Sequence, residues 1–176
     1  MSALRCPADT EYPEYYRPYV DLVPDGDVLM TLQEQLGETL AALQGLSEAQ
    51  ETTPYASGKW NLREVVGHLI DTERVFAFRS LAMARSKDTD LPSMDQDEWV
   101  ASSGAGQRPL DDLTADWAAL RHANVHMFAT MSAAAGAQSG RASGFEFTVR
   151  SFPWIIAGHE LWHRGLIERD YLGEAE

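Results

Sequence analysis

Two pairs of histidines are spaced four residues apart in the sequence, His122 with His126 and His159 with His163. In a helix this spacing stacks two imidazoles on one face, where both can bind the same metal ion. The fifth histidine, His68, stands alone in another helical pattern. The chemistry that these residues suggest is metal chelation, and the orientation of each helix decides which histidines take part.

Positions on a helical wheel, at ~100° per residue, separate the two pairs. Measured from Ile155, His159 lies near ~40° and His163 near ~80°, on or beside the apolar stripe of their helix. His122 and His126 lie opposite the apolar stripe of theirs, so we expect them to face solvent or a partner subunit. A buried polar group without a partner costs roughly 2–7 kcal/mol, a cost that a metal shared by the inward pair would remove. A metal bound by the outward pair is the weaker alternative.

His68 lies at the border of the apolar arc of its helix, which fits a ligand reaching toward an adjacent helix and equally a half-exposed histidine. Glu73 falls in the middle of that helix's apolar face, where a carboxylate needs a partner. Three roles fit Glu73: orienting a ligand imidazole, which we favour, acting as a general base, or pairing with an arginine in the core. Trp60, Trp99 and Trp162 are candidate walls of a substrate pocket, although buried tryptophans are more often plain core.

Four long amphipathic patterns would position these side chains. The predicted helices run from about Asp27 to Leu46, from Leu62 to Arg85, from Leu110 to Met131, and from between Thr148 and Ser151 to Gly173. Helical patterns without a convincing strand ladder imply an all-α protein, a four-helix bundle.

The remaining segments are predicted to be short or irregular. We expect an extended N-terminal arm over residues 1–26 that packs on a single domain over residues 27–173. Within that domain we expect a short helix from Met94 to Val100, a flexible loop from Ala133 to Gly144 and a short extended piece from Phe145 to Val149.

Composition and charge exclude several classes of partner. The formal net charge of −13 argues against DNA or RNA, whose binding depends on Lys and Arg, and against anionic membrane surfaces. No apolar run approaches the ~20 residues of a spanning helix, and the N-terminus does not resemble a signal peptide. A single cysteine, Cys6, fits a reducing compartment, so we expect a cytoplasmic protein.

Three stretches resemble one known family, the DinB-like proteins, a damage-inducible metalloprotein family. They are the stretch from Lys59 to Arg74, with its Trp-led helix and single histidine, the segment from Met94 to Trp99, and the late His-x-x-x-His motif between Ala157 and Gly165. The resemblance covers about residues 28–172, and the combination of the three stretches is quite specific.

The resemblance implies an up-down-down-up four-helix bundle that is often a homodimer. It also implies one divalent metal ion, usually nickel or zinc among the transition metals, bound by the histidines that match His68, His159 and His163. Three neutral histidines leave a coordination position open, as in catalytic rather than structural metal sites. The family includes thiol S-transferases that use bacillithiol, a mycothiol-dependent isomerase, and many members without an assigned reaction.

Two classes of function follow as expectations. The first is a metal-dependent enzyme for a small-molecule substrate: a thiol S-transferase that joins a low-molecular-weight thiol to an electrophile, or a hydrolase that activates water. The alternative is a non-enzymatic stress-response protein whose metal stabilises the fold or senses a ligand.

Overall fold

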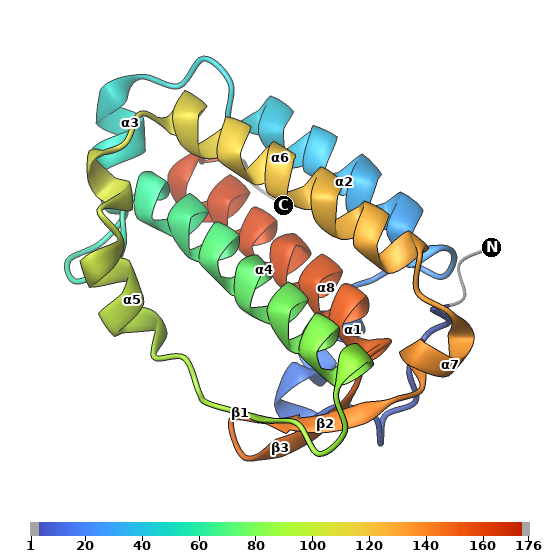
Figure 1. Ribbon diagram of the computed structural model, residues 1–176. Helices are drawn as coiled ribbons and strands as arrows, with labels where there is room; N and C mark the ends of the chain where they lie inside the picture. The colour runs from blue at the N-terminus through green and yellow to red at the C-terminus, as the bar shows by residue number, and fades with distance from the viewer. Residues whose placement is uncertain (1–3, 174–176) are drawn as a thin grey trace.

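Four long helices form the body of the protein, in a computed structural model that describes residues 4–173 (Figure 1). They are α2 (Val28–Ala42), α4 (Leu62–Arg85), α6 (Leu110–Ala129) and α8 (Ser151–Leu166). Both α2 and α4 pack against α6 and α8. Followed by colour in Figure 1, α2 and α8 run in one direction, and α4 and α6 run in the other. The predicted four-helix bundle is confirmed, with the up-down-down-up order.

Local capping explains why α4 begins where the sequence predicted. The Asn61 side chain accepts a hydrogen bond from the Glu64 backbone N–H at 3.0 Å, and the Glu64 carboxylate accepts one from the Asn61 N–H at 2.8 Å. This reciprocal pair satisfies two of the free N–H groups at the helix start. By contrast, α2 ends at Ala42 rather than Leu46, because Gly45 takes a positive φ of 72° just beyond it.

Short helices fill the connections at the bundle ends. After α2 the chain forms α3 (Glu48–Thr52), which the sequence reading missed. Between α4 and α6 it forms α5 (Gln96–Ser103) and the 3₁₀ turn η2 (Ala105–Gln107). The predicted helix over 94–100 therefore exists but starts two residues later, since Asp95 caps it by accepting from the Asp97 and Glu98 N–H groups. After Leu166 the last helix continues as a π-helical turn, η3 (Ile167–Tyr171).

A small sheet contradicts the expectation of a flexible loop over residues 133–144. That segment contains the helical turn α7 (Ala133–Gly136) and the strand β2 (Ser139–Ala142), which pairs antiparallel with β3 (Phe145–Thr148) and parallel with β1 (Asp90–Leu91). The two hairpin-turn residues, Ser143 and Gly144, both have positive φ, as a two-residue hairpin turn requires. The residues of β2 show no alternation of apolar and polar side chains, so only the turn dipeptide indicated the hairpin.

The N-terminal arm is helical where an extended chain was predicted. It forms the 3₁₀ turn η1 (Glu14–Tyr16) and the short helix α1 (Arg17–Val20), and α1 packs against α8. Gly158 permits this close approach, because a Cβ there would lie 1.9 Å from the carbonyl oxygen of Tyr19. Residues 1–3 of the predicted arm lie outside the described residues, and the division of the chain at residue 26 stays a prediction.

The core consists of two hydrophobic clusters with a buried polar layer between them. Each long helix contributes a buried polar residue to this layer. These residues are Gln35 on α2, Glu73 on α4, Arg121 on α6 and Glu160 on α8. Along each chain segment, the residues before the polar one belong mainly to one cluster and the residues after it to the other. Among the described residues, no helix has both the length and the apolar character to cross a bilayer.

Candidate metal centre

Three histidines from two antiparallel neighbouring helices converge. His68 lies in the second turn of α4, and His159 and His163 lie in the second half of α8, so the start of one helix meets the end of the other. One ring nitrogen of each histidine lies within 4.8 Å of the corresponding nitrogens of the other two. The Nε2 atoms of His68 and His159 are 3.2 Å apart. Two metal–nitrogen bonds of ~2.1 Å at a tetrahedral angle would separate their nitrogens by roughly 3.4 Å, so the observed spacing fits a shared ion.

Burial keeps these imidazoles neutral, the protonation state in which they bind metals. Burial lowers the pKa of His68 to about 4. The pKa of His163 is lowered to about 3, mainly by burial and to a smaller extent by the nearby ring of His68. Burial and the two neighbouring rings hold the pKa of His159 well below its ordinary value. At neutral pH all three rings therefore offer lone pairs without first losing a proton.

The polar atoms around the rings also fit a metal. The Nδ1 atom of His163 is buried and has no hydrogen-bond partner among the described residues, and an unpaired buried nitrogen is costly unless a ligand binds nearby. The Thr72 hydroxyl lies 3.4 Å from the Nδ1 atom of His68, one helical turn away on α4, and leaves the Nε2 atom facing His159. A contact of this kind orients a ligand imidazole. The residues present thus fit one divalent ion with an all-imidazole donor set.

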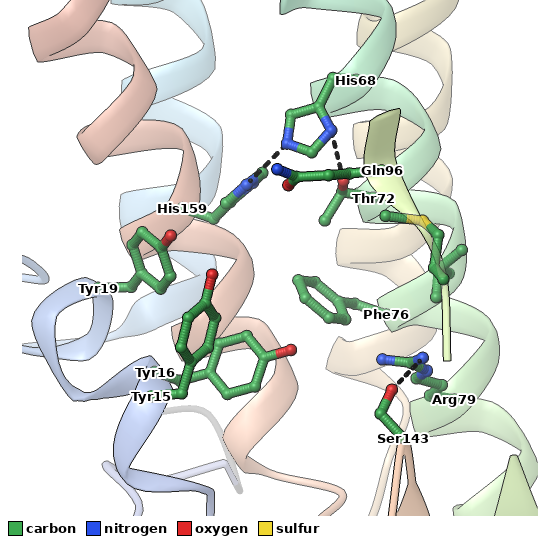
Figure 2. Close-up of a pocket in the computed structure, with 12 residues that line it drawn as sticks. Tyr15, Tyr16, Tyr19, His68, Thr72, Phe76, Arg79, Gln96, Ser143 and His159 are labelled. Carbon is green, nitrogen blue, oxygen red and sulfur yellow. Dashed lines mark hydrogen bonds between the residues drawn. The ribbon is translucent and has the colours of Figure 1, made fainter. Parts of the chain in front are cut away.

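Two cavities flank the three histidines. The first, about 260 Å³ in volume, is lined by His68 and His159, with Tyr15, Tyr16 and Tyr19 on one side and Phe76 and Arg79 from α4 (Figure 2). The second, about 350 Å³, is lined by His163 with Trp60, Lys59, Tyr55 and Tyr171. Gln96 at the start of α5 lines both. The histidines therefore lie between two separate spaces that small molecules could fill.

Glu73 is a buried carboxylate that pairs with an arginine in the core. Its two oxygens accept hydrogen bonds from Arg121 at 2.8 and 2.9 Å, from the Trp117 indole at 2.8 Å and from Asn124 at 3.1 Å. Arg121 also donates to Glu160 at 2.7 Å. Of the three roles that fit its position in the sequence, the pairing with an arginine is the one that the structure shows, because the buried guanidinium needs a carboxylate partner.

The three candidate tryptophans have different surroundings. The ring of Trp60 lies 4.9 Å from that of His68, and the indole lines the second cavity. Trp162 packs edge-on against Tyr19 at 5.6 Å and is half exposed. Trp99 is 42 % exposed and lines neither of the two cavities of the described chain. Trp60 is therefore the tryptophan best placed to touch a bound molecule.

The helical wheel predicted two of the histidines correctly, left one open and did not identify other residues of the site. His122 and His126 are exposed on α6, as the wheel predicted. The wheel left His68 open between a ligand and a half-exposed histidine, and its exposure of 4 % excludes the half-exposed one. The tyrosines of the arm and Arg79 were missed. Arg79 carried a usable signal: it lies eleven residues after His68, which is close to three full turns and hence the same helix face.

Comparison with known proteins assigns the chain to one family and finds a curated relative. The model of the DinB superfamily matches residues 31–167, a range that contains all three histidines. A protein of Geobacillus kaustophilus named "Putative metal-dependent hydrolase" is 31 % identical over 86 residues, which cover 45 % of this chain and 48 % of that protein. The chain thus spans about half the length of this curated relative.

A solved structure extends the likeness over nearly the whole chain. YfiT from Bacillus subtilis, described as "a probable metal-dependent hydrolase with an unusual four-helix bundle topology", matches with a TM-score of 0.69. The match covers 96 % of this chain and 94 % of YfiT at 16 % identity. At that identity the likeness establishes the fold alone.

Proposed function

The chain belongs to the DinB superfamily, and on that premise we propose that it is a metal-dependent hydrolase of small molecules. In this proposal His68, His159 and His163 hold one divalent ion. The observation that carries the proposal is the convergence of three neutral imidazoles beside two cavities. The relative from Geobacillus kaustophilus, 31 % identical over 86 residues, is named a metal-dependent hydrolase, which supports the same reaction class.

The donor set favours a transition metal of borderline softness. Imidazole nitrogens suit zinc, nickel, copper and iron, whereas magnesium and calcium prefer oxygen ligands. No carboxylate belongs to the histidine cluster of the described residues, so the ion's positive charge would not be cancelled by its ligands. When bound, such an ion supplies Lewis-acid activation of water or of a substrate carbonyl. Zinc and nickel are the proposed ions.

The surrounding side chains would orient a substrate and exclude water. Burial raises the pKa of Tyr19 far above neutrality, so its hydroxyl keeps its proton and can donate a hydrogen bond. The Tyr19 ring lies 5.6 Å from that of His159, and Figure 2 shows its hydroxyl on the side of the cavity where the histidines lie. We assign this hydroxyl to a substrate oxygen that gains negative charge during hydrolysis. Phe76 would exclude solvent from the first cavity and Trp60 from the second.

A turnover assay tests the proposed hydrolase. Chelator-treated protein is reloaded with zinc or nickel and tested against ester, amide and lactone substrates. We expect turnover that depends on the added ion and that His159→Ala abolishes, while His126→Ala, which changes an exposed histidine on α6, retains it. Turnover that is the same with or without the ion, or unaffected by His159→Ala, would contradict the proposal. Ion uptake without turnover of any substrate would favour the non-enzymatic stress-response alternative.

The presence of two cavities favours a thiol S-transferase as the second candidate. A transfer reaction needs room for a thiol and an electrophile, and the histidines lie between two spaces of 260 and 350 Å³. Adding a low-molecular-weight thiol to the Co(II)- or Ni(II)-loaded protein should then produce a new charge-transfer band. No spectral change with any thiol would rule out this candidate and leave the hydrolase.

The assembly and the location of the protein stay predictions. A homodimer is expected from the family resemblance, and analytical ultracentrifugation at micromolar concentration would test it by the sedimenting mass. A cytoplasmic location is expected from the single cysteine.

A further inference from the structure

Arg79 is a buried cation without an acidic partner. Its side chain is 4 % exposed, yet no carboxylate of the described residues forms a salt bridge with it. Buried charges in proteins are normally paired, and this chain has 27 acidic residues against 14 basic ones to choose from. The other deeply buried arginine, Arg121, is held by two carboxylates. The missing counter-charge at Arg79 therefore needs an explanation.

The neighbours of the guanidinium are neutral. Its Nη2 atom donates to the carbonyl oxygen of Pro92 at 2.8 Å and to the Ser143 hydroxyl at 3.0 Å. The hydroxyl of Tyr16 lies beside it, and burial raises the pKa of that phenol, which stays neutral. Burial lowers the pKa of Arg79, yet a guanidinium remains charged at neutral pH. The Phe76 ring also lies 5.9 Å from the guanidinium carbon, within reach of a cation–π contact. The positive charge is thus held by neutral groups, and no carboxylate of the described residues forms a salt bridge with it.

This charge faces the first cavity. Arg79 lines that cavity together with the three tyrosines of the arm, and Figure 2 shows the guanidinium at the end opposite the histidines, with the Tyr16 hydroxyl turned toward it. Among residues 4–173, no other Arg, Lys, Asp or Glu lines the cavity. A molecule that fills it meets one fixed positive charge, several hydroxyls and the aromatic ring of Phe76.

The spacing on α4 sets the length of such a molecule. His68 and Arg79 are eleven residues apart on the same helix face, which corresponds to a rise of ~16 Å between their Cα atoms. The side chains come closer than this, because the Phe76 ring lies 5.9 Å from the guanidinium carbon of Arg79 and 6.4 Å from the ring of His159. The gap between the guanidinium and the histidines is therefore on the order of 10 Å. A ligand that touches both ends is therefore elongated.

We propose that Arg79 binds a carboxylate at one end of an elongated, partly aromatic or aliphatic substrate, whose other end lies at the histidines. This substrate class rests on the proposed hydrolase for the identity of the reacting end, but the carboxylate subsite itself does not require the ion. A monoanionic carboxylate matches the single positive charge. A phosphate monoester, at about −1.5 to −2 charges, would leave negative charge uncompensated at the Arg79 end of the cavity, where Arg79 is the one cationic side chain among the described residues.

Binding of three matched probes tests the subsite. They are 4-phenylbutyrate, its neutral amide and 4-phenylbutyl phosphate, measured by calorimetry on zinc-loaded and on chelator-treated protein. We expect the acid to bind roughly tenfold more tightly than the amide in both forms, as a charge-assisted hydrogen-bonded pair provides. The ¹⁵N-labelled Nε resonance of Arg79 should shift with the acid and not with the amide, a change that a purely structural arginine would not show.

Two variants separate the cavity charge from net charge. Arg79→Met should lose the preference for the acid. Arg74→Met removes the same charge from an exposed arginine of α4 that does not line the cavity, and should keep the preference. If Arg79→Met does not fold, the shift of the Arg79 Nε resonance in the wild-type protein still shows whether the acid binds at this residue.

Three results would overturn the subsite: equal binding of acid and amide, an unchanged preference in folded Arg79→Met, or tighter binding of the phosphate. Zinc uptake, measured on the same samples, keeps the two proposals apart. A preserved preference without zinc uptake counts against the hydrolase alone, and zinc uptake with no preference counts against the subsite alone.

Discussion

Replacing Gly158 with alanine should displace α1, the short helix that carries the cavity residue Tyr19. A Cβ at residue 158 would lie 1.9 Å from the carbonyl oxygen of Tyr19 and 2.3 Å from its carbonyl carbon. Real Cβ contacts stay above 3.0 Å, so α1 must move away from α8 by at least about 1 Å. The obstacle is backbone rather than a flexible side chain, and overpacking of this kind costs about 1–3 kcal/mol. We expect a value near the upper end of that range.

Gly165→Ala provides the matched control for this prediction. Gly165 lies in the same helix, and a Cβ there would meet no atom within 4 Å. Both substitutions gain the same helix propensity, about 0.8–1 kcal/mol, so the difference between the two variants isolates the steric cost. Urea unfolding of both should give free energies of unfolding that differ by about 3 kcal/mol, with Gly158→Ala the less stable. Equal stability of the two variants would show that α1 does not pack closely against α8 at Gly158.

Two further predictions concern ion pairs outside the histidine cluster. Arg121→Leu leaves the carboxylates of Glu73 and Glu160 buried without their common partner. We therefore expect the free energy of unfolding to fall by about 3–5 kcal/mol, which lowers the melting temperature by roughly 10 °C. A change below about 1 kcal/mol would contradict the role assigned to the buried polar layer. Hydrogen bonding to Arg150 lowers the pKa of Glu11 below its ordinary 4.5, so the pair stabilises the fold above that pH and loses its contribution as the pH falls through the lower folded-state pKa. The stability difference between wild type and Glu11→Gln should therefore be constant near neutrality and shrink in acid; a difference that does not change with pH would show that the pair does not stabilise the fold.

Helix starts and stops were predictable where the signal is local. The capping residues Asn61 and Glu64 place the start of α4, and the stripe of leucines on α2 marks its buried face. The hairpin was not predictable in this way, because β2 has no β-branched or aromatic residue and its strand conformation depends on pairing with β1 and β3. The helical arm was also not predicted. It packs against the backbone of α8 at Gly158, where no side chain separates the two helices, and a contact this far apart in the sequence has no local signal.

The histidines of the site were predictable, and the side chains around them were only partly so. The four-residue spacing and inward orientation of His159 and His163 follow from one helix alone. Whether His68 joins them depends on which helices are neighbours, and that information came from the family resemblance. Glu73 was placed correctly on the inner face of α4, but the sequence could not show that Arg121 is on the helix packed opposite it.

Metal analysis of protein purified without a histidine tag tests the central claim most directly. Wild-type protein and His126→Ala should each carry about one equivalent of a divalent transition metal, as a single three-histidine site predicts. His163→Ala should carry almost none, because it removes one of three ligands. Metal retained by His163→Ala, or lost from His126→Ala, would contradict the assignment of the ion to the cluster of His68, His159 and His163.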